Sequence, residues 1–248
     1  MRVLIVVNPR SGMGDAGLYE YIRELGLKGV ELTLRFVTTS ESFTRTLSDA
    51  DTFDRIVAVG GDGTVSGVAY GAIGSGVPVL PYPAGTANLF ALNMKLPVDP
   101  LELARLTIEG DVREVDIGEI SFGAGTRRGF IVAAGAGFDA TIMEAADRLK
   151  PTLGPIAYVV GALQNLTPAV ARFTLTIDGR TVTSEGIAAL VMNVSRIQFD
   201  LALTHTSDPS DGMFEVVIVR TRHVPGLIPT VWDAFLDRFV QKPDNVAG

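Results

Sequence analysis

The chain has 248 residues, of which 47% are hydrophobic and 20% charged, and its formal net charge is −7. This composition is typical of a folded protein with one large domain or two modest ones, and the negative charge argues against a nucleic-acid binder. The chain has no cysteine and two histidines, which excludes disulfides and thiolate nucleophiles and disfavours a metal centre built from several histidines.

The first 110 residues alternate between stretches typical of strands and stretches typical of helices. We expect strands at 2–7, 31–37, 56–59 and 77–82 and helices at 18–25, 40–50, 65–73, 89–94 and 99–109. This alternation indicates a parallel sheet covered by helices. The sequence therefore predicts a three-layer α/β nucleotide-binding domain over residues 1–110.

After Gly110 the pattern changes to short alternating stretches. We expect strands at 112–122, 129–134, 171–177, 181–184, 187–193 and 213–219, and helices at 140–149 and 155–166. Asp178-Gly179 between two alternating stretches indicates a hairpin. The sequence thus predicts a β-rich, mostly antiparallel β-sandwich domain over 111–222 for the substrate, followed by a C-terminal helix and tail over 223–248.

Neither a signal-peptide pattern nor a membrane-spanning stretch is expected. The longest nearly uninterrupted apolar run, 156–163, is far shorter than the roughly 18–20 residues that a spanning helix requires. We therefore expect a cytoplasmic protein.

Three loops that follow expected strands are rich in glycine and small polar residues. We name them the first loop (8–14), the glycine-aspartate loop (60–64) and the Pro-Ala-Gly loop (83–88). Ligands of open α/β sheets bind at the carboxyl ends of the strands, so three such loops predict one site. Glycine lets the backbone approach a phosphate, and a following helix offers free N–H groups. The loops therefore indicate nucleotide or phosphoryl chemistry.

The glycine-aspartate loop, Gly60-Gly61-Asp62-Gly63-Thr64, is the most specific of the three. A purely structural turn does not need three glycines together with an acid, although a tight turn with a capping aspartate is the structural alternative. A carboxylate in a phosphate loop suits a cation or a hydroxyl that accepts the phosphoryl group. Asp62 is therefore the candidate catalytic residue.

The other two loops each allow two interpretations. Residues 12–17 match the dinucleotide fingerprint, but 36–39 lack the acid expected at the end of the second strand, so we favour a phosphate loop over NAD binding. In the Pro-Ala-Gly loop, Thr86 and Asn88 can bind a ligand or cap the following helix.

The turn Asp208-Pro209-Ser210-Asp211-Gly212-Met213 is a candidate metal site. Two carboxylates three residues apart, with a turn carbonyl nearby, suit an oxygen-preferring ion such as Mg²⁺. An ordinary Asp/Gly turn is the alternative.

Taken together, these segments resemble the diacylglycerol kinase catalytic-domain family, which includes bacterial soluble lipid kinases and sphingosine kinases. The matching motifs occur in family order and are Asn8-Pro9-Arg10-Ser11-Gly12, Gly60 to Thr64, Pro83 to Asn88, Val115-Asp116-Ile117-Gly118, Gly135 to Ala140 and Ser210-Asp211-Gly212. NAD kinases and phosphofructokinases share the glycine-aspartate turn and a related domain, but they lack the Pro-Ala-Gly-Thr-Ala-Asn segment.

The resemblance implies that ATP binds between two domains and that its γ-phosphoryl group passes to the hydroxyl of diacylglycerol or a similar lipid alcohol. The nucleotide-binding positions that it implies are Asn8, Ser11, Gly12, Thr39, Gly60, Gly61, Asp62, Gly63, Thr64, Gly85, Thr86 and Asn88. It also implies a structural Mg²⁺ site formed by Asp208, Asp211 and the Met213 carbonyl. Transient contact with a membrane surface would use basic residues such as Arg127, Arg128, Arg148 and Lys150, and a homodimer is compatible with it.

Two departures from the family pattern affect the expected activity. The family continues its glycine-aspartate turn with a hydrophobic residue and then Asn-Glu, whereas this chain has Val65-Ser66-Gly67, so we expect a polar pair facing the site to be lost. The late Asp-Gly-Glu segment, whose aspartate is the family's proposed general base, is not found in the sequence. Two alternatives to a lipid kinase are therefore a catalytically degenerate ATP-binding relative and a kinase for a soluble substrate such as NAD.

Overall fold

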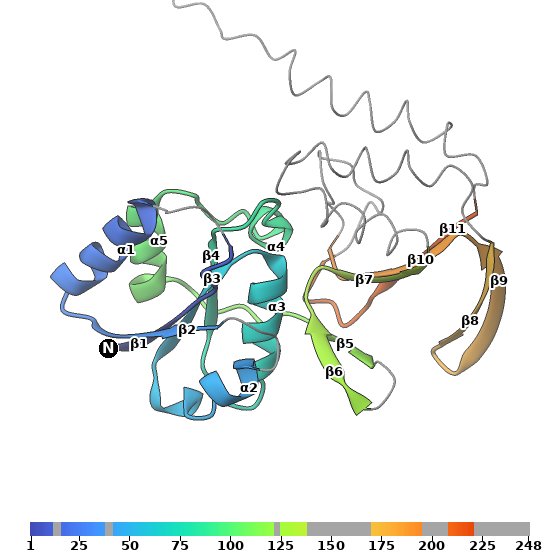
Figure 1. The fold of residues 1–248 in the computed structure, drawn as a ribbon, viewed down its shortest axis with the longest axis horizontal. Helices are drawn as coiled ribbons and strands as arrows, with labels where there is room; N and C mark the ends of the chain where they lie inside the picture. Colours follow the sequence, from blue (N-terminus) through green and yellow to red (C-terminus); the bar gives the residue numbers. More distant parts are fainter. Residues whose placement is uncertain (12–15, 38–41, 122–124, 138–169, 195–207, 221–248) are drawn as a thin grey trace, which may run out of the picture. The chain divides into compact units, whose positions relative to one another are not determined.

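The computed structural model describes residues 1–11, 16–37, 42–121, 125–137, 170–194 and 208–220 (Figure 1). These residues belong to two compact units. Unit 1 contains Met1–Val132 together with Asn193 and the turn 208–213, and unit 2 contains the strands from Ala133 onward. The helices expected at 140–149 and 155–166 and the C-terminal helix expected within 223–248 lie outside the described residues, as do Gly12, Thr39, Arg148 and Lys150.

Unit 1 contains the predicted parallel sheet. Its strands are β1 (Arg2–Val7), β2 (Glu31–Phe36), β3 (Arg55–Gly60) and β4 (Val79–Pro83), in the order β2-β1-β3-β4. All three neighbouring pairs are parallel. The helices of this unit are α1 (Ala16–Leu27), α2 (Ser42–Thr46), the 3₁₀ helix η1 (Ala50–Thr52), α3 (Asp62–Gly71), α4 (Leu89–Asn93) and α5 (Pro100–Glu109).

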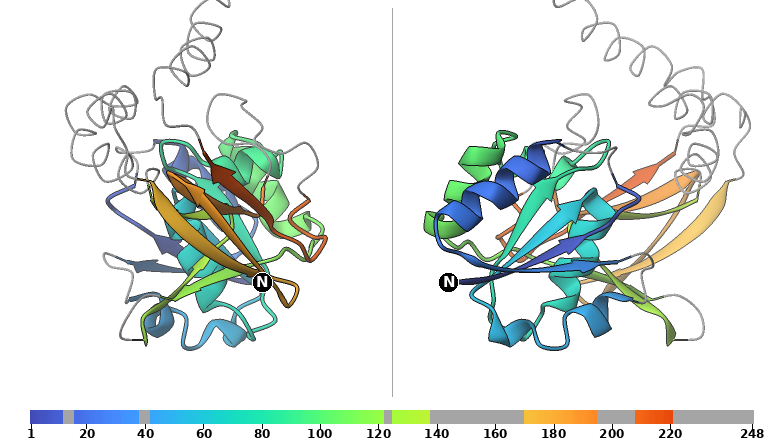
Figure 2. Two further views of the ribbon diagram at one scale, coloured as in Figure 1. Left: turned by 90° about the vertical axis from the view of Figure 1, so that its right-hand side faces the viewer. Right: turned by 60° about the vertical axis from the view of Figure 1, so that its left-hand side comes forward.

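The helices cover both faces of this sheet, which confirms the expected α/β architecture. Successive side chains of β1 and β3 enter two separate cores because side chains alternate along a strand. One core packs against α3, and the other packs against α1 and α5, as the right-hand view of Figure 2 shows. Both central strands are buried on two faces, which is why they appear in the sequence as nearly continuous apolar runs.

Unit 2 is antiparallel in the residues that the structure describes. Its strands are β7 (Ala133–Gly137), β8 (Ala171–Ile177), β9 (Arg180–Gly186), β10 (Ala188–Met192) and β11 (Glu215–Val219). Strands β7, β10 and β11 form one sheet, and β8 and β9 form a hairpin. Asp178 and Gly179 both have positive φ at the hairpin turn, with φ values of 49° and 77°, which confirms the turn predicted from these two residues.

The expected helix over 40–50 is wrong in its extent, since α2 ends at Thr46 and η1 follows it. The Arg35 guanidinium donates a hydrogen bond to the Thr46 carbonyl at 2.5 Å. That contact satisfies a carbonyl that the end of the helix leaves without a helical partner, and the 3₁₀ helix follows after a short turn.

Two expected strands also differ from the structure. Residues 112–117 are not in a strand, and β5 covers only Gly118–Ser121, where it pairs with β6 (Arg127–Phe130). The backbone before β5 instead bonds a later turn, as in the 2.6 Å contact from the Asp116 N–H to the Pro209 carbonyl. The single strand expected at 129–134 is divided between β6 and β7.

Among the described residues, none of the helices combines the length and apolar character needed to cross a membrane.

Candidate functional site

The three loops of unit 1 are joined by hydrogen bonds at the carboxyl ends of β1, β3 and β4. Asn8, which follows β1, donates from its backbone to the Val59 carbonyl at 3.0 Å and from Nδ2 to Thr64 Oγ1 at 2.9 Å. Ala84, which follows β4, donates from its backbone to the Gly60 carbonyl at 3.2 Å. The glycine-aspartate loop therefore lies between the other two loops and contacts both.

Asp62 links the glycine-aspartate loop to the helix after the Pro-Ala-Gly loop. Its two carboxylate oxygens accept hydrogen bonds from the backbone N–H groups of Leu89, at 3.0 Å, and Phe90, at 2.9 Å. Asp62 thus caps the start of α4 from a distant position in the sequence. Each carboxylate oxygen has a second lone pair, so these bonds leave Asp62 able to accept a further ligand.

The Pro-Ala-Gly loop is closed by Asn88 and packed directly on the backbone of Gly61. The Asn88 side chain accepts from the Gly85 N–H at 2.8 Å and donates to the Gly85 carbonyl at 2.9 Å. Asn88 has φ of 50° and makes no side-chain capping bond to α4, so the capping alternative for this residue is wrong. A Cβ on Gly85 would lie 2.3 Å from the Gly61 Cα, so only glycine permits this approach.

Free donors lie at the start of α3, within the glycine-aspartate loop. The helix begins at Asp62, three residues earlier than expected, and the N–H groups of Thr64 and Val65 bond the Gly61 carbonyl. The amides of Asp62 and Gly63 stand before these bonds begin and are the donors that a helix start leaves for a ligand. A Cβ on Gly63 would have no atom within 4 Å, so the space on the side-chain side of this residue is open.

The remaining nucleotide-site predictions are placed as follows. Thr86 is exposed in the Pro-Ala-Gly loop, and Ser11 donates its N–H to the Asn8 carbonyl at 3.0 Å. Arg10 is exposed beside them, and its N–H bonds Asn8 Oδ1 at 3.0 Å. Gly12 and Thr39 lie outside the described residues. The structure therefore brings together the described members of the three loops and adds one cation, Arg10, next to them.

The expectation that Ser66 and Gly67 replace a polar pair facing the site is wrong. Ser66 is 8% exposed, and its Oγ accepts a hydrogen bond from the Ile131 N–H at 3.3 Å. A Cβ on Gly67 would lie 2.4 Å from the Phe43 ring. Both positions face the interior of unit 1, because α3 turns them away from the loop that precedes it. The Ile131 carbonyl in turn accepts a hydrogen bond from Asn193 Nδ2 at 3.0 Å.

Restoring the family residue in Gly67→Glu should destabilise the protein. The added side chain would overlap the Phe43 ring, and overpacking of this kind costs about 1–3 kcal/mol of unfolding free energy. Urea denaturation measures the loss, and adding Phe43→Ala to the variant should recover part of it. The matched control is Gly26→Glu, in helix α1, where a Cβ meets nothing within 4 Å. Equal stability of Gly67→Glu and the unchanged chain would contradict this packing.

The far end of α3 is held by the β5–β6 hairpin, a contact with no signal in the sequence. The Tyr70 hydroxyl donates a hydrogen bond to Glu119, which raises the pKa of Tyr70 because the bond stabilises the neutral phenol. Arg127 pairs with the same carboxylate at 3.3 Å, and the absence of a side chain on Gly129 makes room for the Tyr70 ring. Helix α3 therefore cannot shift along its axis without breaking these contacts.

The candidate metal site 208–213 is a turn that packs against residues 113–116. Asp208 Oδ1 is 2.5 Å from Arg113 Nη2, and the Gly212 N–H bonds Asp116 Oδ2 at 2.7 Å. Asp211 is exposed, and its Oδ1 accepts from the Met213 N–H at 2.9 Å. No group of three or more His, Cys, Asp or Glu residues in the described part of the chain is arranged to hold a metal ion. The sequence missed Arg113, whose charge offsets that of Asp208.

Comparison with known proteins shows two matching families. The family described as "Diacylglycerol kinase catalytic domain" matches residues 2–120, and the "YegS C-terminal NAD kinase beta sandwich-like domain" matches residues 132–246. The second match supports the expected β-sandwich class for the later part of the chain.

Several curated proteins are similar over most of the chain. A protein named "Probable lipid kinase YegS-like" from Xanthomonas oryzae pv. oryzae is 31% identical over 87% of this chain and 72% of its own length. The diacylglycerol kinase of Bacillus subtilis is 29% identical over 92% of this chain and 76% of its own length. That of Mycobacterium tuberculosis is 28% identical over 89% and 74%.

Solved structures share the fold. A crystal structure of a putative diacylglycerol kinase from Bacillus anthracis covers 98% of this chain and 82% of its own, with a TM-score of 0.70 and 21% identity. Another diacylglycerol kinase structure from the same organism covers 97% of this chain and 78% of its own, with a TM-score of 0.68 and 22% identity. Together with the matching motifs and loops, these similarities show that the chain belongs to the diacylglycerol kinase catalytic-domain family of lipid kinases.

Proposed function

We propose that the chain is an ATP-dependent kinase that transfers the γ-phosphoryl group to the hydroxyl of diacylglycerol or a similar lipid alcohol. The observation that best supports this function is the connection of the three loops through Asn8, Thr64 and Asp62. These bonds hold glycine backbone and free amide donors together at the carboxyl ends of the strands. Phosphoryl transfer depends mainly on such positioning and on neutralising charge, with little covalent chemistry by the protein.

In this proposal, some of the described groups bind the nucleotide and others assist the transfer of the phosphoryl group. The amides of Asp62 and Gly63 bind phosphate oxygens, and Arg10 supplies positive charge near the first loop. Gly60, Gly61 and Gly85 permit the close approach, while Thr86 is exposed for contact with the nucleotide. Asp62 is the proposed catalytic contributor, since its second lone pairs can face a cation or the accepting hydroxyl while α4 holds the carboxylate in place.

Mg²⁺ is the proposed second cofactor, bound at the turn 208–213. Asp211, Asp208 and the Met213 carbonyl offer the oxygen donors that this ion prefers. The Arg113–Asp208 ion pair would then have to break so that Asp208 could bind the cation directly. Otherwise Asp208 would bind the cation through a water molecule. The ion would offset the negative charges of Asp208 and Asp211. It would also stabilise the packing of this turn against residues 113–116.

The test of this function is transfer of labelled phosphate from ATP to diacylglycerol in mixed micelles. We expect transfer that requires added Mg²⁺ and is lost on chelation with EDTA, because Mg²⁺ that accompanies ATP would neutralise the phosphate charge, separately from the structural ion proposed at the turn 208–213. Calorimetric titration with ATP should be run on the same preparation to measure binding separately from turnover.

The alternatives give different results in the same assays. ATP binding without transfer to any long-chain alcohol would indicate the catalytically degenerate relative. Transfer to NAD or a sugar phosphate but not to lipid would indicate a soluble substrate. The contacts of Ser66 with Ile131 and of Gly67 with Phe43 remove one argument for the degenerate alternative. A lipid kinase of this kind would act from the cytoplasm, in transient contact with a membrane surface.

A further inference from the structure

The connection between α4 and α5 exposes three aliphatic side chains near the place where the three loops meet. Leu92 is 46% exposed, Val98 is 84% exposed and Leu101 is 45% exposed. Helix α4 begins directly after the Pro-Ala-Gly loop, and Figure 1 shows the connection along the upper edge of unit 1, where α3 also begins. We name these three residues, together with Lys95 between them, the tip.

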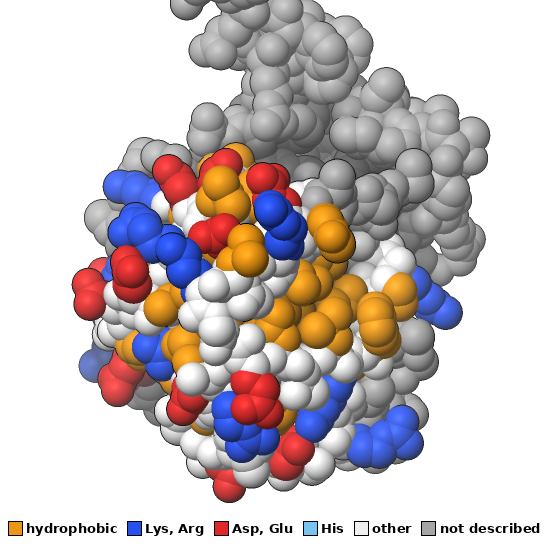
Figure 3. All heavy atoms as spheres, turned by 90° about the vertical axis from the view of Figure 1, so that its left-hand side faces the viewer, with side chains coloured by type: hydrophobic (Ala, Val, Ile, Leu, Met, Phe, Trp, Pro, Cys, Tyr) orange, Lys and Arg blue, Asp and Glu red, His pale blue; other side chains and the backbone are white. Residues whose placement is uncertain are grey.

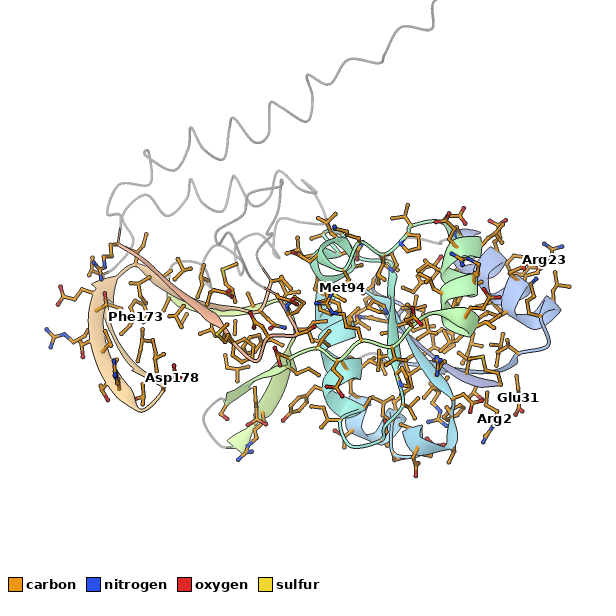
Figure 4. The ribbon with its side chains drawn as sticks, turned by 180° about the vertical axis from the view of Figure 1, so that it is seen from behind. Arg2, Arg23, Glu31, Met94, Phe173 and Asp178 are labelled. Carbon is orange, nitrogen blue, oxygen red and sulfur yellow. The ribbon has the colours of Figure 1, made fainter. Side chains whose placement is uncertain are left out.

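Buried residues hold the tip in place from both sides. Phe90 and Ala91 of α4 are each 6% exposed, and Met94, which is labelled in Figure 4, packs against the core beside α3. On the other side, Leu103 and Ala104 of α5 are fully buried. The tip is therefore a fixed surface, and a partner that binds it does not have to order a loose segment first.

Lys95 occupies a backbone conformation that favours glycine. Its φ is 54°, and α4 ends there with hydrogen bonds from the Lys95 N–H to the Leu92 carbonyl, at 3.1 Å, and from the Leu96 N–H to the Ala91 carbonyl, at 2.9 Å. These two bonds form a Schellman motif, in which glycine is the usual residue at the position of Lys95. The side chain of Lys95 is exposed, so it does not offset the backbone strain by packing. A strained residue of this kind points to a use for its charge.

A phospholipid bilayer is the partner whose chemistry suits the tip. Aliphatic side chains insert between acyl chains, while a lysine stem lies along the apolar region and its ammonium group reaches the headgroup phosphates. Figure 3 views unit 1 from the side of α1 and α5 and shows that hydrophobic side chains also reach the surface elsewhere, between charged ones. Exposure alone therefore does not select the tip. Its position beside the loops and the strained Lys95 do.

Charge alone does not explain a contact with a membrane. The net charge of the chain is −7, and Arg127, which the sequence suggested for this contact, lies 3.3 Å from the carboxylate of Glu119. Insertion of apolar side chains does not depend on net charge, because it is driven by the removal of apolar surface from water. We therefore expect the aliphatic residues of the tip to supply most of the binding.

We propose that the tip inserts into the surface of a phospholipid bilayer and thereby brings the three loops to the hydroxyl of a membrane lipid. This inference rests on the proposed function, for which it supplies the contact with the substrate. The binding is weak and reversible. A single myristoyl chain binds membranes with about 10⁴ M⁻¹, and the tip offers less apolar carbon, so roughly millimolar lipid is needed.

A single labelled cysteine tests the insertion directly, because the chain has no cysteine of its own. In Val98→Cys labelled with the fluorophore NBD, vesicles of phosphatidylcholine and phosphatidylglycerol should shift the emission to the blue and raise its intensity. The matched control is labelled Ile73→Cys, since Ile73 is 62% exposed just after the other end of α3. No change at residue 98, or an equal change at both residues, would overturn the proposal.

Lys95→Gly separates the charge of the tip from the stability of the protein. Glycine relieves the strain of the positive φ, so the midpoint of urea denaturation should rise. Binding to vesicles that contain phosphatidylglycerol should nevertheless weaken by roughly 5-fold, the effect of one cation near an anionic surface. Lys28→Gly removes an exposed cation after the end of α1 and should leave vesicle binding unchanged. A more stable Lys95→Gly variant with unchanged binding would overturn the role of Lys95.

A double variant with Val98→Gln and Leu101→Gln tests the aliphatic part of the tip. Sedimentation with vesicles should show binding weakened by at least about 10-fold. The matched control combines Leu27→Gln and Ile73→Gln, which remove side chains 68% and 62% exposed at the far ends of α1 and α3. It should bind vesicles like the unchanged chain. Equal binding of the two double variants would overturn the proposal.

Activity measured with two forms of the lipid separates this inference from the proposed function. ATP affinity and transfer to a short-chain, water-soluble diacylglycerol should be equal in the unchanged chain and both double variants. Transfer to diacylglycerol in vesicles should fall in the tip variant and not in its control. Vesicle binding that depends on the tip, without transfer to either lipid, would support the tip and contradict the kinase. Transfer to vesicle lipid that is equal in all three proteins would do the reverse.

Discussion

Replacing Asp62 with alanine is expected to lower both the stability of the protein and its phosphoryl-transfer activity more than any other single change in the three loops. The variant loses two charge-assisted hydrogen bonds to the amides of Leu89 and Phe90. Loss of a helix cap with bonds to a charged acceptor costs about 2–3 kcal/mol of unfolding free energy. The start of α4 would then lose its link to the glycine-aspartate loop, which would remain joined to the Pro-Ala-Gly loop by the Ala84–Gly60 bond and the packing of Gly85 on Gly61. Misplacement of a site by about 1 Å can cost roughly 100-fold in rate, so we expect kcat/KM to fall at least that far.

A second capping aspartate in the same unit provides the control. Asp99 accepts hydrogen bonds from Leu101 and Glu102 at the start of α5, both at 2.9 Å, and it is not part of the three loops. Asp99→Ala should therefore lose a comparable unfolding free energy, measured by urea denaturation, while ATP affinity and transfer stay close to those of the unchanged chain. Equal loss of activity in Asp62→Ala and Asp99→Ala would show that Asp62 acts only through stability.

Asp62→Asn separates the charge of this side chain from its position. The amide keeps one acceptor oxygen and a similar shape, so it should retain part of the cap. If Asp62 contacts a cation or the accepting hydroxyl, activity should fall much further than the loss of unfolding free energy accounts for. Near-normal turnover with the asparagine would remove Asp62 from the catalytic residues and leave it as a positioning residue.

The second large effect is expected for Gly85→Ala. Its Cβ would lie 2.3 Å from the Gly61 Cα and 2.9 Å from the Gly61 nitrogen, so backbone atoms of one loop must move. Unlike a side-chain clash, this cannot be relieved by a change of rotamer. We expect a loss of about 1–3 kcal/mol in unfolding free energy and a weakening of ATP binding by at least roughly 10-fold. Calorimetric titration with ATP measures the affinity.

Gly63→Ala is the matched comparison within the same site. A Cβ at Gly63 meets no atom within 4 Å, and the residue lies in the first turn of α3. Its unfolding free energy should be unchanged or raised by up to about 1 kcal/mol, because alanine favours helix. ATP binding should nevertheless weaken, since the methyl group would occupy the space through which a phosphate approaches. Unchanged ATP affinity in both variants would place the nucleotide elsewhere.

The sequence predicted the first unit well because its signals are local. The apolar runs of β1 and β3, the loops after them and the periodic helices each arise from neighbouring residues, and apart from the helix expected at 40–50 the structure contains these elements close to the expected positions. Parallel strands end at one edge of a sheet, so the sequence also predicts that the three loops meet, as their hydrogen bonds confirm. Motif order also predicted the family, which the comparisons confirm.

Contacts between residues far apart in the sequence explain where the expected elements differ from the structure. Residues 112–117 alternate like a strand, yet the turn 208–213 takes their hydrogen bonds, about 95 positions later in the sequence. Where α2 ends, its last carbonyl accepts a hydrogen bond from Arg35, which comes from another element. Local patterns contain no information about such partners.

The sequence alone predicts the three loops as a phosphate-binding set, since glycine spacing and small polar residues are local properties of the chain. Only the tertiary structure decided three other points. These are the hydrogen-bond partners of Asp62, the glycines at which no side chain fits, and the direction in which Ser66 and Gly67 face. Asp62 and Leu89 are 27 positions apart, and Gly61 and Gly85 touch through their backbones. Their proximity results from packing helices on both faces of one sheet, which fixes the direction of each side chain on α3.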